Sequence, residues 1–378
     1  MRVAIVSESF LPQANGVTDT VCHVVDELVR AGHEPLVIAP GPGLDDYRGV
    51  PVVRVRSMSV PGYRAFPVGL PDSAVEATLA QFRPDVVHLA APIVLGAVGL
   101  RAARRLGIPT VAAYQTDIAA AARHHGPLAG PALTRWVARV HRRADRTLAP
   151  SRSSMAQLEA MGVPGTWLWG PGVDLDQFDP RRRSPELHDL WARATHQGGG
   201  RTVVGYVGRL VAEKQVRRLE EVARVPGTRV VVVGDGPERG WLEEHVPGLT
   251  FTGELCGREL AQAFASLDVF VHPGESETFC QAVLEAQASG VPVVAAASGG
   301  PVDLVTDGRT GLLFDPTERA SLRRATATLV GDPVRRRTLA DRASTDVAGR
   351  TWQRVVEELV GQHYAEVRRG ASGGSAAA

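Results

Sequence analysis

The stretch over residues 269–297 constrains the fold more than any other part of the sequence. It opens with an apolar run over 269–271 that has the length and composition of a buried strand. A loop rich in turn-forming residues follows, then a helical pattern over 279–289 that stops at Gly290, and a second apolar run over 292–296. This order predicts a βαβ unit of a parallel sheet. The loop before the helix then lies at the carboxyl edge of the sheet, where such folds bind ligands.

Two glutamates frame the predicted helix of this unit. Glu277 precedes the helix and Glu285 lies about two turns inside it, so their separation along the axis is about 12 Å at a rise of ~1.5 Å per residue. That spacing suits the two ends of one elongated ligand, and the backbone N–H groups of residues 278–281 suit a phosphate between them. The residues alone leave two interpretations open. One is a site for a phosphorylated sugar with a ribose attached, and the other is a capped surface helix whose dipole favours Glu277.

The composition is that of a soluble globular protein large enough for two domains. The chain has 378 residues, of which 44% are hydrophobic and 22% charged, and its formal net charge is +1. A charge this small gives no reason to expect a nucleic acid as partner. Three scattered cysteines, no signal peptide before the first strand, and no apolar run long enough to span a bilayer lead us to expect a cytoplasmic protein.

Lys214 is the only lysine in a chain with 42 lysine and arginine residues. A genome that favours arginine codons removes lysine wherever arginine serves equally well. A single remaining lysine therefore indicates a position that needs a compact ammonium rather than a planar guanidinium, although one residue can also persist by chance.

The remainder of the chain repeats an alternation of strands and helices, which predicts an α/β fold with parallel sheets. In the first half we expect strands over 2–7, 34–39, 52–56, 84–88, 110–114 and 146–150, a helix over 17–30 and another that begins at Ser151. In the second half we expect strands over 202–207, 229–233, 249–251 and 310–314, a helix over 216–223, a mobile excursion over 181–200 and a final helix over 352–367.

Several residues of the first half are candidates for a ligand site. Tyr63 and Arg64 lie in a predicted loop, and an aromatic ring beside a cation suits a sugar or a lipid headgroup, although a solvated loop is the commoner explanation. Gln115 and Asp117 follow a predicted strand and so lie at the carboxyl edge of the sheet. Glutamine cannot act as a base, which leaves Asp117 as the nearest candidate.

The segment over 101–146 is strongly basic. Leu133, Trp136, Val137 and Val140 recur within it at helical spacing between arginines. Two interpretations remain open for this pattern: an amphipathic helix attracted to an anionic membrane surface, or a solvated helix face with ordinary core contacts.

The 277–294 segment resembles the retaining glycosyltransferases of family 4, which have the GT-B fold. Their signature has two glutamates with seven residues between them and a Phe-Gly-like pair after the first, and here Glu277-Thr278-Phe279-Cys280 and Glu285 match it. The chain departs from the pattern at Cys280, where the family usually has glycine. A second match is the Gly-Arg-Leu-x-x-x-Lys segment with Arg209 and Lys214, so the resemblance reaches the same lysine that composition singles out.

The resemblance implies two Rossmann-like domains facing across a cleft. It divides the chain into an acceptor-side domain over 1–170, a nucleotide-sugar domain over 171–347, a helix over 348–369 that returns to the first domain, and a disordered tail over 370–378. It implies that Arg209 and Lys214 bind the donor phosphates, that Glu277 binds the transferred sugar and that Glu285 binds the ribose. The other donor residues it implies are Gly16, Gly234, Thr278, Phe279, Cys280 and Gln281. In relatives a histidine often stands at the position of Gln115 and contacts the acceptor or the transferred sugar.

The implied activity is transfer of a hexose from a nucleotide sugar with retention and without a metal or other cofactor. The chain looks most like actinobacterial α-mannosyltransferases that use GDP-mannose and glycosylate a lipid or glycolipid, which would place it on the inner face of the membrane. A UDP-sugar is the alternative donor, acting on a small molecule or glycan. The residues are also compatible with a sugar-nucleotide epimerase and with a binding protein without turnover. A pyridoxal-dependent phosphorylase is disfavoured because Lys214, the one lysine, is assigned to phosphate.

Overall fold

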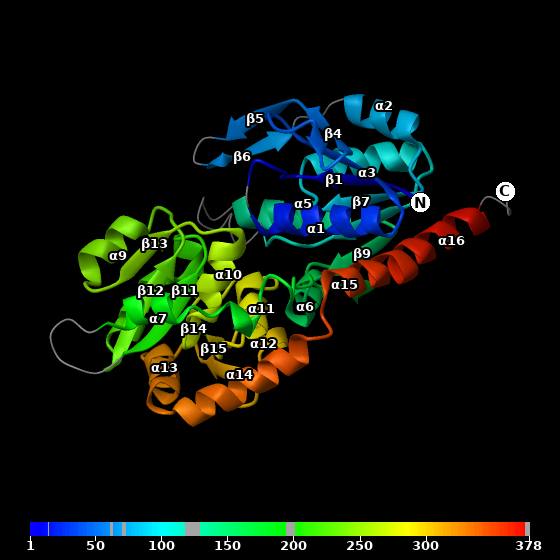
Figure 1. The fold of residues 1–378 in the computed structure, drawn as a ribbon. Helices are drawn as coiled ribbons and strands as arrows, with labels where there is room; N and C mark the ends of the chain where they lie inside the picture. The colour runs from blue at the N-terminus through cyan, green and yellow to red at the C-terminus, as the bar shows by residue number, and fades with distance from the viewer. Residues whose placement is uncertain (14, 61–62, 70–72, 118–128, 194–200, 375–378) are drawn as a thin grey trace. The chain divides into compact units, whose positions relative to one another are not determined.

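The computed structural model describes the chain except residues 14, 61–62, 70–72, 118–128, 194–200 and 375–378, and the side chains of residues 59–68, 129 and 372–374 are also left out. The contacts divide the chain into two compact units (Figure 1). Unit 1 comprises Met1–Gly172 and Trp352–Ala378, and unit 2 comprises Val173–Thr351. The sequence-based boundaries after residues 170 and 347 precede the contact-based ones, which fall after Gly172 and Thr351.

Unit 1 is built on an eight-stranded sheet in the order β10-β9-β8-β7-β1-β2-β4-β3. All neighbouring strands pair in parallel except β3 with β4. The strands are β1 (Arg2–Ser7), β2 (Glu34–Pro40), β3 (Asp46–Tyr47), β4 (Val50–Val55), β7 (Val86–Ala90), β8 (Thr110–Ala113), β9 (Arg146–Ala149) and β10 (Thr166–Leu168). A separate antiparallel hairpin is formed by β5 (Ser57–Val60) and β6 (Tyr63–Gly69), where a loop was predicted.

Helices cover both faces of the unit 1 sheet. They are α1 (Gly16–Arg30), α2 (Ser73–Phe82), α3 (Leu95–Arg105), α5 (Ala129–His141), α6 (Arg152–Ala160), α15 (Trp352–Glu358), the π-helical η5 (Leu359–Tyr364) and α16 (Ala365–Gly374). Side chains alternate along β1, so Val3 and Ile5 pack with α1 and the C-terminal helices, while Ala4 and Val6 pack with α2 and α3. Such strands, buried on both faces, explain why apolar runs in the sequence located them.

The C-terminal segment belongs to unit 1 because its polar contacts are made there. The Trp169 indole N–H donates to the carbonyl of Val355 at 3.0 Å, and the Tyr364 hydroxyl lies 2.9 Å from Nδ1 of the buried His88. The helix continues through Gly374, so the predicted disordered tail over 370–378 is wrong for the residues up to 374. Extending a helix by one residue adds a hydrogen bond at little further cost, which carries α16 into a stretch of weak helix formers.

Unit 2 contains a six-stranded, fully parallel sheet in the order β13-β12-β11-β14-β15-β16. Its strands are β11 (Thr202–Val207), β12 (Thr228–Val233), β13 (Thr250–Gly253), β14 (Val269–His272), β15 (Val293–Ala296) and β16 (Gly311–Phe314). The predicted strands of the second half correspond to these within one or two residues. With the parallel sheet of unit 1, they confirm the prediction of two Rossmann-like domains.

The helices of unit 2 form a layer on each face of its sheet, and Figure 1 shows them around β11–β15. Those that pack with Phe270 and Val293 are α7 (Pro185–Ala192), α10 (Gly257–Ala265) and α11 (Gln281–Ala288). Those that pack with Tyr206 and Val271 are α8 (Leu219–Ala223), α9 (Arg239–His245) and α13 (Ser321–Gly331). The unit also contains η2 (Pro180–Arg182), η3 (Ala212–Lys214), η4 (Val216–Arg218), α12 (Pro301–Leu304) and α14 (Pro333–Val347).

The predicted mobile excursion over 181–200 is wrong for its first part. Residues 180–182 form η2 and residues 185–192 form α7, which Ser184 caps by accepting a hydrogen bond from the Leu187 N–H. Trp191 is buried in the core, which anchors α7 despite its polar sequence. The residues of the excursion from 194 to 200 lie outside those that the structure describes.

Candidate active site in unit 2

The candidate site lies where the strand order of unit 2 changes direction. β11 pairs with β12 on one side and with β14 on the other, so the chain leaves these two neighbouring strands toward opposite ends of the sheet. A parallel sheet opens a crevice at the carboxyl ends of two such strands, and ligands bind there. The loop after β11 carries Lys214 and the loop after β14 carries Glu277, which brings together residues 63 positions apart.

The centre of the site is the carboxylate of Glu277 with two cationic donors. The Lys214 ammonium donates to Oε1 of Glu277 at 2.5 Å, and Nε2 of His272 lies 2.8 Å from the same oxygen. Only 11% of the Glu277 side chain and 4% of the His272 side chain are exposed, against 24% for Lys214. Both side-chain hydrogen bonds of Glu277 to described residues converge on Oε1, so Oε2 keeps its acceptor capacity for a ligand hydroxyl.

The three groups change one another's protonation in the same direction. Burial by itself raises the pKa of Glu277, but Lys214 and His272 outweigh burial and hold the pKa well below its usual range. Burial lowers the pKa of His272, but Cys280 and Glu277 outweigh it and raise the pKa to about 10. For Lys214, too, the attraction of Glu277 outweighs burial, and the pKa rises. Lys214 and His272 are therefore both cationic at neutral pH and converge on the carboxylate of Glu277, which favours an anionic ligand beside them.

A second layer of residues fixes the orientation of His272. The Tyr206 ring stacks on the imidazole, with centroids 6.2 Å apart and planes 17° from parallel. The Tyr206 hydroxyl donates to the carbonyl of Arg209 at 3.0 Å, which ties the loop after β11 to the same ring. A Cβ at Gly274 would lie 2.9 Å from Nε2 of His272 and 3.3 Å from Oε1 of Glu277, so glycine is the residue that fits between the loops.

Other glycines let the backbones around the site approach closely. Gly234 has φ +130°, and a Cβ there would lie 2.1 Å from the carbonyl oxygen of Gly208. A Cβ at Gly300 would lie 2.3 Å from the carbonyl oxygen of Phe279, and the Gly300 N–H donates to the carbonyl of Glu277 at 2.7 Å. Gly234, predicted to bind the donor, thus shapes the loop after β11, and Gly300 fixes the loop after β14.

The helix after Glu277 begins later than the sequence pattern indicates. α11 starts at Gln281, and Cys280 stands before it with φ 82° and ψ 74°, in the left-handed region. Phe279 is buried beneath the Arg350 guanidinium, 4.9 Å from the ring centroid. The backbone of Phe279 and Cys280 therefore forms the turn into α11 rather than its first turn. A positive φ at Cys280 also explains why a glycine suits this position in a related chain.

The remaining predicted donor residues of unit 2 are placed less centrally. Glu285 lies inside α11 and is partly buried, and Thr278 and Gln281 are partly buried beside the turn. Half of the Arg209 side chain is exposed, and its guanidinium pairs with Glu213 at 3.0 Å instead of with Glu277. Arg209 shares the loop of Lys214 but is not part of the buried cluster.

Unit 1 has an equivalent switch point between β1 and β7. Glu8, directly after β1, accepts hydrogen bonds from the N–H groups of Ile93 and Gly96 at 2.7 and 2.8 Å, at the start of α3. Burial raises the pKa of this carboxyl, against the opposing effect of those N–H donors. In the same loop, Asn15 caps α1 by accepting from the N–H of Val17 and Thr18. A Cβ built on Gly16, the first residue of α1, would have none of the neighbouring described atoms within 4 Å.

The acceptor-side candidates are placed only in part. Asp117 follows β8, and its Oδ2 accepts a hydrogen bond from the Gln157 side chain of α6 at 2.6 Å, so any role as a base would require this bond to change. Gln115 lies beside it, also after β8, partly buried. The side chains of Tyr63 and Arg64 lie outside those that the structure describes.

Sequence reasoning missed His272 and Glu8 as site residues. His272 is the last residue of β14 and Glu8 directly follows β1, and each of these buried parallel strands lies at a switch point. Gln115 and Asp117 likewise follow a buried parallel strand, β8. For His272 the usable signal was its position at the end of an apolar run, five residues before Glu277. Its partner Lys214 is far away in the sequence, so the contact itself is not visible there.

Comparisons with known proteins show the family of the chain. The model described as Glycosyltransferase Family 4 matches residues 14–177, and the one described as Glycosyl transferases group 1 matches residues 201–332. A GDP-mannose-dependent alpha-mannosyltransferase from Mycobacterium tuberculosis is 49% identical over 97% of each chain. A protein of the same description from Corynebacterium glutamicum is 44% identical over 97% of this chain and 89% of its own.

Among solved structures, Anabaena Alr3699/HepE in complex with UDP has a TM-score of 0.78 at 20% identity, over 97% of this chain and 100% of that one. The fold and the matched family models define a glycosyltransferase of the GT-B class, as predicted. The chain belongs to glycosyltransferase family 4, and the predictions of family and of a hexosyltransferase enzyme are confirmed.

Proposed function

We propose that this protein transfers mannose from GDP-mannose to a lipid or glycolipid acceptor, with retention at the anomeric carbon. The observation that carries the proposal is the Lys214–Glu277–His272 cluster at the switch point of unit 2, which combines two cationic side chains with one hydrogen-bonded carboxylate. Two relatives at 44% and 49% identity bear the description GDP-mannose-dependent alpha-mannosyltransferase, which favours GDP and mannose over a UDP-sugar.

The chemistry assigned to the cluster is stabilisation of the leaving group. Negative charge develops on the terminal phosphate of GDP as the bond to the sugar breaks, and a partly buried ammonium stabilises that charge strongly. Lys214 is held for this by Glu277, and His272 holds the carboxylate from the other side. Arg209 and the backbone N–H groups of Phe279 and Cys280 are proposed to assist at the phosphates.

Glu277 is proposed to bind the transferred sugar through Oε2, and Glu285 to bind the ribose. The low pKa of Glu277 keeps it an acceptor of hydroxyl hydrogen bonds at any pH near neutrality. The departing phosphate is proposed to take the acceptor proton, with Asp117 as the other candidate, since Asp117 is already hydrogen-bonded to Gln157. Gly16 retains its proposed role of approaching the donor diphosphate.

The donor is tested by measuring nucleotide release from a panel of GDP- and UDP-sugars. We expect GDP-mannose to give the highest kcat/KM, with UDP-glucose at least tenfold lower, and we expect NMR of the product to show an α-linked mannose. A matched comparison with GDP-glucose separates recognition of guanine from recognition of mannose. Preferred turnover of a UDP-sugar would replace the donor, and binding of GDP-mannose without turnover on any acceptor would replace the enzyme by a binding protein.

Metal independence is tested by chelation. Catalysis here rests on Lys214 and backbone N–H groups, so we expect activity with GDP-mannose to stay within about twofold in excess EDTA. A metal site is nevertheless conceivable at the cluster, because side-chain atoms of His272, Glu277 and Cys280 lie within 4.8 Å of one another and are of the types that bind zinc. Loss of activity in EDTA, restored by Zn²⁺ in the wild type and not in Cys280→Ser, would assign the metal to these three residues.

A lipid acceptor requires the enzyme to work at a membrane surface. Within the described residues, no helix has the length and apolar content needed to cross a bilayer. We propose peripheral association with the cytoplasmic face. Two further relatives with lower identity are described as phosphatidylinositol mannoside mannosyltransferases, which supports a membrane glycolipid as the class of acceptor.

A further inference from the structure

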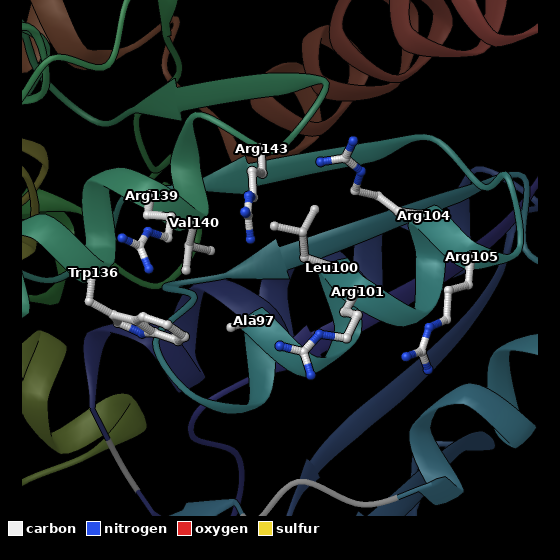
Figure 2. Close-up of a pocket in the computed structure, with 9 residues that line it drawn as sticks. All are labelled: Ala97, Leu100, Arg101, Arg104, Arg105, Trp136, Arg139, Val140 and Arg143. Carbon is white, nitrogen blue, oxygen red and sulfur yellow. The ribbon is translucent and has the colours of Figure 1, made fainter.

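A basic pocket lies between α3 and α5 of unit 1. Its volume is about 300 Å³. It is lined by three small or apolar residues, one tryptophan and five arginines, all drawn in Figure 2. The lining residues are Ala97, Leu100, Arg101, Arg104, Arg105, Trp136, Arg139, Val140 and Arg143. Leu100 and Val140 are buried in the core, so the pocket has an apolar floor and a cationic rim.

The positive charge of this pocket is almost uncompensated. Arg105 pairs with Glu76 at 2.8 Å. In the part of the chain that the structure describes, the other four arginines have no carboxylate partner. Arg101 and Arg105 are four positions apart in α3, and like charges at this spacing destabilise a helix. The chain has a net charge of only +1, so this concentration is local.

The helix dipoles account for only part of the pattern. Arg104, Arg105 and Arg139 lie in the last turns of α3 and α5, where a cation is favourable. That effect does not place Arg101 one turn earlier, and it does not explain why both helices direct their cations at one shared pocket. The use of arginine rather than lysine carries no weight in this chain, because arginine replaces lysine at nearly every basic position.

We propose that this pocket binds the phosphodiester headgroup of an anionic phospholipid. Guanidinium groups match phosphate oxygens in pairs, and several of them around one hollow suit a headgroup better than a single ion. The volume fits one headgroup rather than a whole lipid. Trp136 adds a wall of the amphipathic kind found at membrane interfaces: the residue is 38% exposed, and its indole N–H donates to the carbonyl of Ile93 at 2.7 Å.

The choice of a lipid rather than a free phosphate rests on the proposed function, since transfer to a lipid brings the enzyme to the bilayer. In that position the pocket would anchor unit 1 while unit 2 binds the donor. The pocket involves no residue of the Lys214–Glu277–His272 cluster, so the two sites can be tested separately.

The test is sedimentation with vesicles of phosphatidylglycerol and phosphatidylcholine, against vesicles of phosphatidylcholine alone. We expect the wild type to bind only the anionic vesicles and to be released as salt screens the charges. An Arg101→Gln/Arg139→Gln double variant should lose about 10- to 30-fold in partition coefficient, the scale expected for two cations near an anionic surface. The control is Arg258→Gln/Arg323→Gln, which removes two exposed arginines of unit 2 and should change the partition less than twofold.

Three outcomes would overturn the proposal. They are unchanged vesicle binding in the pocket variant, equal losses in the pocket and control variants, and a Trp136-dependent fluorescence response to inorganic phosphate without any vesicle binding. Calorimetric binding of GDP to the pocket variant should match the wild type, which shows that the variant is folded. Vesicle binding without turnover in the donor panel would refute the enzyme function and leave the pocket assignment intact.

Discussion

Replacing Lys214 by alanine lowers turnover of GDP-mannose at least 100-fold while the fold persists. The expected loss is on the scale of removing one preorganised donor to a developing anion, ~10²–10³ in rate. The structure gives the reason, because the Lys214 ammonium is the partly buried cation on Glu277 and the bond of 2.5 Å holds it in place. The loss should appear mainly in kcat, since charge on the phosphate grows as the transition state is reached.

Two variants separate this role from a general effect of charge. Arg217→Ala removes a cation three residues further along, which is paired with Glu238 in an exposed position, and should leave turnover within about twofold of the wild type. Lys214→Arg keeps the charge but replaces a compact ammonium by a planar fork, so we expect it to recover only a small part of the rate. Turnover of Lys214→Ala within tenfold of the wild type would refute the assignment of the phosphate site.

Most of the strands could be predicted because both parallel sheets are buried on both faces. A strand such as β11 or β14 must then be a short continuous apolar run, which is visible in the sequence. The hairpin of β5 and β6 was missed because it is a separate antiparallel sheet with no such run, and its Pro67 is of the kind that marks a loop. The order of the strands in the sheet determines the switch point, and no local pattern in the sequence predicts this order.

The candidate site could be predicted residue by residue but not as an arrangement. The resemblance selected Lys214 and Glu277 as two ligands of one donor, Lys214 for its phosphates and Glu277 for its sugar. The structure instead joins them directly through Oε1 and adds His272, so that Lys214 is held by the carboxylate that is proposed to bind the sugar. This coupling depends on β11 and β14 being neighbours, which is a property of the topology.

The second large effect is expected for Glu277→Gln, which should reduce turnover of GDP-mannose at least 100-fold. The amide keeps the size of the side chain, but it no longer attracts Lys214 or His272 as an anion does, and its single oxygen must serve acceptor roles that two carboxylate oxygens share. Glu213→Gln is the matched control, because it removes one carboxylate from the adjacent loop, where Glu213 pairs with Arg209. That variant should retain turnover within about threefold.

Glu277→Gln should also change the titration of His272, which a purely steric defect would not do. In the wild type the pKa of His272 is raised to about 10, although burial alone lowers it. Glu277 is one of the two residues that raise this pKa, the other being Cys280, so the pKa should fall when the carboxylate is lost. NMR of the His272 imidazole from pH 5 to 10 measures the change, and Glu213→Gln should titrate as the wild type does. An imidazole that titrates near 6.5 in the wild type would contradict the proposed cluster.

The raised pKa of His272 also makes the free energy of unfolding depend on pH. A histidine that binds its proton more tightly in the folded state stabilises the fold fully below its unfolded pKa of ~6.5, and this contribution is lost as pH rises toward 10. The lowered pKa of Glu277 has the opposite pH dependence: its contribution to stability is present above the unfolded pKa of ~4.3. This contribution is therefore constant between pH 6.5 and 10. The free energy of unfolding of the wild type should therefore decline from pH 6.5 to 10 relative to Glu277→Gln, as measured by urea denaturation. If the free energy of unfolding depends on pH in the same way in the two proteins, Glu277 does not stabilise the protonated form of His272. The phosphate site would then have Lys214 as a cation but not His272.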